Sequence, residues 1–243
     1  MNEIKKFELE VNERVGGYEF NNSLKKSAKK FMAESTVPKY SYNFSWMGRP
    51  IIQYPQDIVA MQELIWDIKP DLIIETGIAW GGSVILYASI MELIGKGRVV
   101  AIDKVLPDKN RDAIAAYPFS SRISLIEGSS LDVDVHSQVQ SLIRKDDTVM
   151  VMLDSNHTHE HVLEELRLYG PYVSRDQYLV VSDTVVERIP EQKHRKRPWG
   201  PGDNPGTALA SFLEEDGRFE RDTNVNNKLL ATFTPGGYVR RVR

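Results

Sequence analysis

Leu72-Ile-Ile-Glu-Thr-Gly-Ile-Ala-Trp-Gly-Gly-Ser83 is the stretch that decides the fold of this chain. A short apolar run with a carboxylate near its end leads into a glycine-rich turn, and a helix-like run follows to Ile94. Glycine permits positive φ and close approach of the backbone, and the first turn of a helix offers free N–H groups. A second apolar run ends in an acid at Asp103. A glycine turn after one strand and an acid after the next is how α/β proteins hold an adenosine-containing cofactor.

The composition is that of an ordinary globular chain. It has 243 residues, of which 41% are hydrophobic and 27% are charged, so there is enough apolar material for a core. The net charge of −3 gives no broad attraction to nucleic acid, so no nucleic-acid partner is expected. The absence of cysteine excludes disulfides, thiolate metal sites and cysteine nucleophiles. No signal core or membrane-length apolar run is present, so we expect a cytoplasmic protein without an integral membrane segment.

Strand-like and helix-like runs alternate through the middle of the chain. The expected strands are Leu72–Thr76, Arg98–Asp103, Ile123–Glu127, Thr148–Asp154 and Tyr178–Asp183, and the helices between them are Ser83–Ile94, Asn110–Tyr117, Asp132–Lys145 and His159–Tyr169. This repetition predicts a parallel sheet covered on both faces, with right-handed crossovers. Lys228–Arg241 is interpreted as a hairpin that turns at Pro235-Gly-Gly237. The expected fold is a doubly wound, Rossmann-like α/β fold with a mostly parallel seven-stranded sheet closed by an antiparallel C-terminal hairpin, the usual shape of class I methyltransferases.

The flanks divide the chain into two expected parts. Residues 1–45 form a polar N-terminal helical extension, and residues 46–243 form the methyltransferase domain. One face of the extension is apolar, through Leu24, Ala28, Phe31 and Met32. We expect this face to pack on the core or on a partner subunit, and it makes a homo-oligomer the expected assembly. Helices are further expected at Pro55–Ile68, with proline in the first turn, and at Asn204–Leu213.

The glycine spacing bears on which cofactor is bound. The loop has the pattern G-x-x-x-G-G, whereas a dinucleotide prefers G-x-G-x-x-G. Glu75 precedes the loop and favours S-adenosylmethionine, which carries an amino group and a sulfonium in place of a pyrophosphate. Asp103 would bind the ribose hydroxyls, and Glu127–Ser130 would contact the adenine. The expected cofactor-binding residues are Glu75, Gly77, Ala79, Gly81, Gly82, Ser83, Asp103, Gly128, Ser129, Ser130 and Asp154. The alternative is a tight turn without a ligand.

Two aspartates end the expected fourth and fifth strands. Asp154 and Asp183 would lie at the carboxyl edge of the sheet, where α/β proteins bind ligands. Two carboxylates there could hold Mg²⁺ through oxygen ligands. The alternative is that each aspartate caps the helix or turn that follows it.

Three histidines lie within the segment Asp154–His161. His157 and His161 are spaced for one helix face, which can suggest zinc. Thr158 resembles an N-cap, however, so His157 should lie in the loop before the helix. A loop histidine near a cation is suited to act as a general base, and the alternative is an exposed loop histidine.

Two further segments leave alternatives open. Lys193–Arg197 is basic and Pro198–Pro205 is rich in proline and glycine, which is typical of a solvated mobile loop or of a positively charged lid over an anionic acceptor. Ser41–Tyr54 is rich in aromatic residues, which pack in the core or line an acceptor pocket.

Six segments together resemble the cephalosporin hydroxylase family, whose members have class I S-adenosylmethionine-dependent methyltransferase folds. The segments are Pro50–Asp57, Glu75–Ser83, Ile126–Ser130, Leu153–His159, Arg197–Gly202 and Pro235–Tyr238. The resemblance runs from about Tyr42 to the end of the chain. That family is similar in turn to the Mg²⁺-dependent sugar O-methyltransferases of macrolide biosynthesis, which hold a cation by an aspartate after the fourth strand and an acidic pair after the fifth. Asp154 and Asp183 match two of these positions, Ser182 takes the third, and His157 stands at the position of the base.

The resemblance implies an S-adenosylmethionine-dependent, Mg²⁺-assisted O-methyltransferase that acts on a sugar hydroxyl of a nucleotide sugar, glycolipid or polysaccharide precursor. Asp154 and Asp183 would hold the metal, and His157, with Asp154, would carry the catalysis on a small-molecule or glycan acceptor. One alternative is hydroxylation or methoxylation of a β-lactam or another natural product, although a two-histidine, one-carboxylate iron site is not evident. Another is a cofactor-binding partner subunit that no longer catalyses, for which Ser182 would be a symptom.

Overall fold

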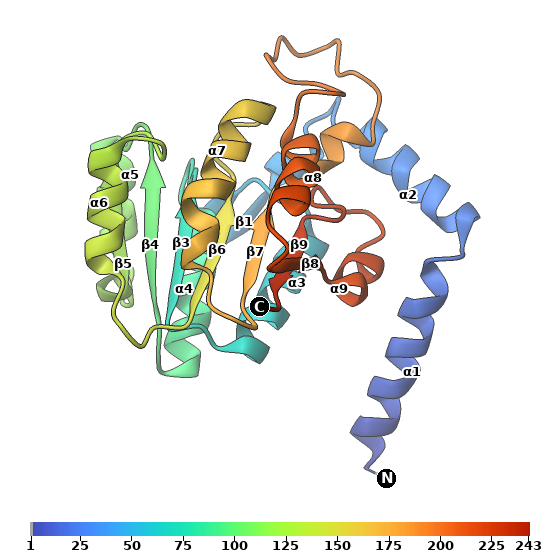
Figure 1. Ribbon diagram of the computed structural model, residues 1–243, viewed down its shortest axis with the longest axis horizontal. Helices are drawn as coiled ribbons and strands as arrows, with labels where there is room; N and C mark the ends of the chain where they lie inside the picture. Colours follow the sequence, from blue (N-terminus) through green and yellow to red (C-terminus); the bar gives the residue numbers. More distant parts are fainter. Residues whose placement is uncertain (1) are drawn as a thin grey trace.

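A seven-stranded sheet lies between two layers of helices in the computed structural model, which describes residues 2–243 (Figure 1). The strand order is β5-β4-β3-β6-β7-β9-β8. The first five strands in this order are parallel, and β9 runs antiparallel to both β7 and β8. The strands are β3 (Leu72–Thr76), β4 (Arg98–Asp103), β5 (Ile123–Glu127), β6 (Val149–Leu153), β7 (Tyr178–Val181), β8 (Phe219–Arg221) and β9 (Tyr238–Arg241).

Helices cover both faces of the sheet, so side chains of both parities are buried on the central strands. Ile73 of β3 packs with the helices of one face and Ile74 with those of the other. One layer consists of α3 (Pro55–Ile68), α4 (Gly82–Ile94) and α5 (Asp108–Ala115), and the other of α6 (Val133–Leu142), α7 (His159–Tyr169) and α8 (Pro205–Glu215). Single 3₁₀ turns cover Ser120–Arg122, Gly170–Tyr172 and Thr184–Glu187. The burial of both faces explains why the strands are continuous apolar runs.

Local signals fix the helix ends that matter for the site. Pro55 occupies the first turn of α3, where its missing N–H costs nothing. Gly95 ends α4 in the left-handed conformation. Asn204 and Thr207 form a reciprocal capping box at the start of α8. The predicted helices Pro55–Ile68 and His159–Tyr169 are confirmed to the residue.

The predicted C-terminal strand pair is antiparallel as expected, but its first strand was wrongly placed. Lys228–Thr234 is not a strand, and β9 pairs instead with β8, from which α9 (Thr223–Lys228) separates it. Asp222 caps α9 by accepting a hydrogen bond from the Val225 amide at 3.0 Å. The Thr232 hydroxyl donates to the carboxylate of Asp57 on α3. The segment after α9 is therefore held against α3, since the Phe233 amide also donates to Asp57 and the Ala231 carbonyl accepts from Gln56.

The N-terminal extension packs on the core through its second helix. It consists of α1 (Glu3–Tyr18), α2 (Asn22–Ser35) and a 3₁₀ turn over Tyr40–Asn43, and the hairpin of β1 (Phe44–Trp46) and β2 (Arg49–Ile51) follows. Met32 of α2 is 3% exposed, in contact with Tyr54 and Phe233. Of the face expected to pack, Ala28 and Met32 are buried on the core, whereas Leu24 and Phe31 are 37% and 41% exposed.

By contrast, α1 projects away from the body of the molecule (Figure 1). Its inner end lies against α9, where Val15 is buried, while Ile4 and Phe7 are 64% and 61% exposed. No helix within residues 2–243 combines the length and the apolar character needed to cross a membrane.

Candidate active site at the carboxyl edge of the sheet

Two adjoining cavities lie at the carboxyl ends of the parallel strands. One, of about 290 Å³, is lined by the glycine loop, Asp154, His157 and Asp183. The other, of about 260 Å³, is lined by the loops after β4, β5 and β6. Gly77, Asp103 and Ser155 line both. This is the edge at which open α/β sheets bind ligands.

The glycine loop passes so close to other backbone that side chains are excluded from it. A Cβ at Gly77, where φ is +79°, would lie 2.2 Å from the carbonyl oxygen of Asp154. A Cβ at Gly82 would lie 2.2 Å from the carbonyl oxygen of Pro50. The loop therefore lies directly against the end of β6 and against β2.

Asp103 holds this loop in place. Its Oδ2 accepts hydrogen bonds from the amides of Ile78 at 2.9 Å and Ala79 at 3.0 Å, and its Oδ1 accepts one from Val105 at 3.2 Å. Asp103 also lines both cavities, so it joins the loop to the space that the two cavities share. The sequence placed Asp103 at the cofactor but did not anticipate its bonds to the loop.

Glu75 lies beneath the loop and not in a cavity wall. Its side chain is 1% exposed and faces α4. Burial raises the pKa of Glu75 to about 8, although the neighbouring hydroxyls of Ser83 and Tyr87 lower it. The binding of a cofactor amino group by Glu75 therefore stays a prediction. In the structure, the Glu75 side chain packs beneath the first turns of α4, beside Ser83 and Tyr87.

The other predicted cofactor residues are placed as follows. Gly77, Ala79, Gly82, Ser83, Asp103 and Asp154 line the first cavity, and Gly128, Ser129 and Ser130 line the second. Gly81 adopts a left-handed conformation as the N-cap of α4 and packs on Ile114. One contact that the sequence did not indicate is Arg49 of β2, which donates to the Trp80 carbonyl at 2.5 Å and so fastens the loop from outside.

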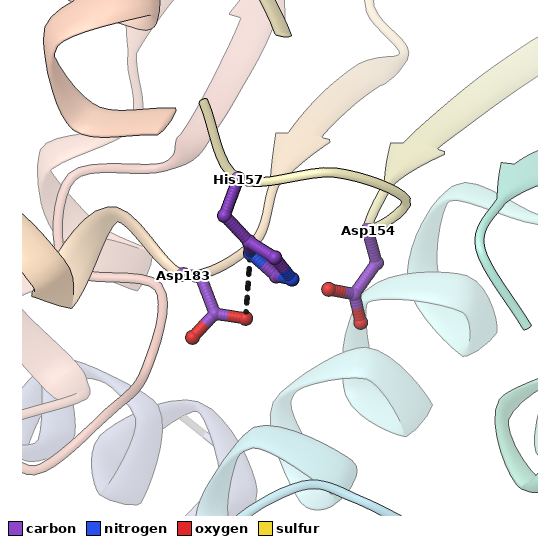
Figure 2. Close-up of side chains that lie close together, drawn as sticks. All are labelled: Asp154, His157 and Asp183. Carbon is purple, nitrogen blue, oxygen red and sulfur yellow. Dashed lines mark ion pairs between the residues drawn. The ribbon is translucent and has the colours of Figure 1, made fainter. Parts of the chain in front are cut away.

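Asp154, His157 and Asp183 converge at the boundary of the first cavity (Figure 2). Asp154 follows β6 and Asp183 follows β7, and one ligand atom from each of the three residues lies within 4.8 Å of the others. His157 Nδ1 lies 3.1 Å from Asp183 Oδ2. Asp183 has a φ of +54°, which is a strained backbone for an aspartate and is often found at functional sites.

The electrostatics of this cluster suit a divalent cation. Burial raises the pKa of Asp154 well above its usual range, and the charges of Asp183, Glu75 and Glu165 raise it further. Within residues 2–243, no lysine or arginine forms an ion pair with either aspartate. Two carboxylates without a balancing side-chain cation form an oxygen donor set that fits Mg²⁺, and the imidazole of His157 lies beside it.

Neither Ser182 nor His161 contributes to this cluster. Ser182 is buried, and its hydroxyl points to Met152 Sδ at 3.6 Å, so it offers nothing to the cluster. His161 points into the other cavity, with its Nε2 3.2 Å from the Ser155 hydroxyl. His157 and His161 therefore do not converge as a zinc pair.

A third cavity, of about 120 Å³, adjoins the cluster on the side of the N-terminal extension. Its walls come from α2, the aromatic segment and the loop after β7, and include Tyr42, Tyr54, His157, Asp183, Arg195, Arg197 and Trp199. The aromatic segment thus contributes to a cavity as well as to the core.

Aromatic stacking organises this third cavity. The rings of His157 and Trp199 are 4.8 Å apart, and the Arg197 guanidinium lies 4.9 Å from the Trp199 ring centre. Arg195 lies over the Tyr42 ring at 5.7 Å and donates to the Thr36 carbonyl at 3.0 Å. The loop therefore presents two guanidinium groups that are held by rings and backbone.

The ends of this loop are joined to each other. Glu187 Oε2 accepts hydrogen bonds from the Gly202 amide at 2.8 Å and from the Asn204 side chain at 2.6 Å. The backbone of Gly200 and Asp203 forms an antiparallel bridge. Residues 188–201 therefore form a loop whose two ends are bonded to each other.

The Rhamnosyl O-methyltransferase/CmcI family profile matches residues 38–242. Rhamnosyl O-methyltransferase of Mycobacterium bovis is 30% identical over 221 residues, covering 86% of this chain and 85% of that protein. The protein of that name from Mycobacterium leprae is 29% identical over 200 residues, covering 81% and 82%.

Two solved structures share the architecture. CmcI with Mg and S-adenosylmethionine has a TM-score of 0.58 at 15% identity, covering 83% of this chain and 78% of that chain. An O-methyltransferase from Bacillus cereus in complex with S-adenosylhomocysteine has a TM-score of 0.53 at 16% identity, covering 82% of each. At such low identities the likeness shows the fold alone, and it confirms the predicted class I methyltransferase fold.

Proposed function

Since the chain belongs to the Rhamnosyl O-methyltransferase/CmcI family, we propose that this S-adenosylmethionine-dependent O-methyltransferase methylates a sugar hydroxyl of a nucleotide sugar, glycolipid or polysaccharide precursor. One observation carries the proposal. His157 and Asp183 line both the first and the third cavities. A methyl donor in the first cavity and an acceptor hydroxyl in the third would therefore meet at these two side chains. Positioning two reactants in this way supplies much of the rate enhancement in transfer reactions.

The cofactor would span the two cavities at the carboxyl edge. Its methionine part would lie against the glycine loop and the start of α4, near Asp154. Its ribose would lie at Asp103, and its adenine at Gly128–Ser130. The carboxylates along this path suit a ligand whose ammonium and sulfonium groups are positive.

Asp154 and Asp183 would hold Mg²⁺, with His157 beside them. The metal would supply positive charge that orients the acceptor hydroxyl and lowers its pKa. The carboxylate excess of the cluster supports this assignment, and the missing third acid at Ser182 leaves a position for water or acceptor.

His157 would receive the proton of the acceptor hydroxyl. If its Nδ1–H donates to Asp183, Nε2 is the acceptor that faces the cavity. The Trp199 ring packed against the imidazole restricts its rotation. Together these contacts set the orientation that a general base requires.

The alternatives find less support in the geometry. Within residues 2–243, the cluster that could hold a metal contains one histidine and two aspartates, and not the two histidines and one carboxylate of an iron oxygenase. A subunit that only binds cofactor would not need a second cavity at His157 and Asp183.

The direct test is calorimetry of the purified protein with S-adenosylmethionine, with and without Mg²⁺, followed by mass spectrometry of sugar acceptors. We expect binding of the cofactor and Mg²⁺-dependent appearance of a methylated sugar. The absence of cofactor binding in both conditions would contradict the proposal. His157→Ala should bind cofactor like the wild type yet lose methyl transfer, and unchanged transfer would remove His157 as the base.

We also propose that residues 1–45 complete the acceptor cavity and join copies of the chain into a homo-oligomer. Met32 and Thr36 line the third cavity. Beyond α9, the apolar stripe of α1 continues to Ile4 and Phe7, which are exposed and suit the same stripe of a second copy. Light scattering should give an oligomer for the wild type and a smaller species for Phe7→Glu, with Lys5→Glu as the control. We place the reaction in the cytoplasm, where S-adenosylmethionine is supplied.

A further inference from the structure

A cavity of about 380 Å³ adjoins the third cavity farther along the same face of α2, and Met32 lines both. It is enclosed by α2, α9 and the turns that follow β7 and precede β9. Four cationic side chains line it, namely Lys25, Lys29, Arg188 and Arg221, and its lining contains no aspartate or glutamate. No step of methyl transfer uses this cavity.

The two arginines converge on one glycine. A Cβ at Gly236, where φ is +80°, would lie 2.9 Å from Arg188 Nη2 and 3.5 Å from Arg221 Nε. Arg221 Nε donates to the Gly236 carbonyl at 3.2 Å. The missing side chain at Gly236 therefore makes room for two guanidinium groups side by side.

Nothing in the described chain neutralises this pair. Within residues 2–243, no carboxylate lies within ion-pair distance of Arg188 or Arg221. Burial lowers the pKa of Arg188, and the charge of Arg221 lowers it further. Two like charges held together without a counter-charge are unfavourable unless an anion binds between them.

The lysines extend the positive charge along one face of a helix. Lys25 and Lys29 are four residues apart on α2, so they lie on the same side of it. The rest of the lining combines apolar side chains with side-chain amides and hydroxyls, including Met32, Val185, Ile189, Leu229, Thr223 and Asn227. A charged rim over an apolar floor fits an anionic group that is attached to an organic portion.

We propose that this cavity binds a phosphate or diphosphate group between Arg188 and Arg221, with Lys25 and Lys29 beside it. Guanidinium groups bind phosphate oxygens in a bidentate manner, which explains the use of arginine at the centre. Met32 and Val185 line both this cavity and the acceptor cavity, so the bound anion would lie one side chain away from the acceptor. The phosphate could come from the carrier of the acceptor or from a free metabolite.

The test uses the full chain and inorganic pyrophosphate, titrated by calorimetry at low ionic strength. Arg188→Gln and Arg221→Gln should each weaken binding about tenfold or more, because each removes a charge-assisted hydrogen bond. The double variant Lys25→Gln/Lys29→Gln should weaken it by a smaller factor. The matched control is Lys26→Gln/Lys30→Gln, on the same helix but outside the lining, which should leave binding unchanged.

A second readout separates binding from a structural role. Without pyrophosphate, Arg188→Gln should raise the Tm or leave it unchanged, since it relieves repulsion from Arg221, and pyrophosphate should raise the Tm of the wild type more than that of the variant. A nucleoside diphosphate that binds more tightly than pyrophosphate identifies a carrier-linked phosphate, whereas tighter pyrophosphate identifies a free one.

Two results would overturn the proposal. One is a wild-type protein that binds S-adenosylmethionine but no pyrophosphate or nucleoside diphosphate at millimolar concentration. The other is equal affinity for pyrophosphate in the wild type, Arg188→Gln and Arg221→Gln. Because the readout is anion binding, neither result depends on methyl transfer.

Discussion

The two sides of the candidate active site are built in different ways. The cofactor side comes from consecutive strand–loop units, in which the loops after β3, β4 and β5 lie next to one another. The acceptor side collects α2, the segment around Tyr54, the loop after β7 and Phe233, which are far apart in the sequence. The first is shaped by backbone in close contact, and the second by rings and long side chains. Changes on the cofactor side should therefore cost folding, and changes on the acceptor side should cost affinity.

The largest effect should follow from Gly77→Ala, on the cofactor side. The new Cβ would lie 2.2 Å from a backbone carbonyl oxygen that cannot move without displacing β6. We expect a loss of about 4 kcal/mol or more in the free energy of unfolding, together with loss of cofactor binding. Urea denaturation and calorimetry would measure both.

Gly95→Ala is the matched control for that substitution. Gly95 has a similar φ of +83°, but nothing lies within 4 Å of its added Cβ. It should cost only about 1 kcal/mol, from backbone strain alone. Equal losses for the two variants would show that the contact with Asp154 is not what shapes the loop.

Asp154→Asn tests the boundary between the two sides. The variant should fold and bind S-adenosylmethionine, because its shape is preserved. Methyl transfer should fall about a hundredfold, since charge stabilisation at a metal contributes several kcal/mol and 1.4 kcal/mol is tenfold. Stopped-time assays at saturating Mg²⁺ would measure the rate. Retained activity would mean that Asp154 is not a metal ligand.

Asp57 should make the acceptor side sensitive to pH. Burial raises the pKa of this carboxyl to about 8, from 3.8, and its hydrogen-bonding partners are Thr232 and the Phe233 amide. Between pH 3.8 and about pH 8 the folded state keeps a proton on Asp57 that the unfolded state releases. The free energy of unfolding therefore falls as the pH rises through this range. Asp57→Asn should remove this loss, so its stability relative to the wild type should rise by about 1.4 kcal/mol for each pH unit between pH 5 and pH 8.

Urea denaturation at the two pH values measures this effect. The exposed Asp112→Asn is the control and should leave the pH dependence of the wild type unchanged. Glu75, whose pKa burial also raises to about 8, should leave part of the dependence in Asp57→Asn. A variant that follows the wild type at both pH values would mean that Asp57 is ionised when folded.

The smallest effect should come from the loop arginines. Arg195→Gln and Arg197→Gln should each raise the KM for the acceptor about tenfold, if the acceptor is anionic, and change kcat less. Affinity for S-adenosylmethionine should not change in Arg195→Gln, because Arg195 does not line the two cavities assigned to the cofactor. Lys196→Gln, which lies between them but lines none of the three cavities, is the control. An unchanged KM in all three variants would assign the loop to a purely solvated role.

The same contrast explains what the sequence could predict. The glycine loop and Asp103 belong to neighbouring strand–loop units, so their spacing was enough to place them together. Asp154 and Asp183 were placed because the carboxyl ends of parallel strands meet at one edge. The stacking of Arg197, Trp199 and His157 depends on how a long loop folds back, and no periodic pattern encodes that.

The misplaced strand has a related physical cause. Leu229 and Phe233 are apolar and spaced as in a strand, but in the structure both are buried beside helices. The true strand β8 has one buried apolar residue, Phe219, and is recognised only by its pairing with β9. Likewise Arg188 and Arg221 come together only because β7 and β8 both neighbour β9.

Glu187 binds the far end of the loop formed by residues 188–201, so the two ends of this loop stay together whatever its length. Because Gly202 and Asn204 are held at Glu187, a longer or shorter loop should not pull on β7 or α8. Doubling the length of such a loop costs only about 0.6 kcal/mol of closure entropy. This segment can therefore gain or lose residues without a change of fold, and we expect such changes to alter the third cavity that it lines.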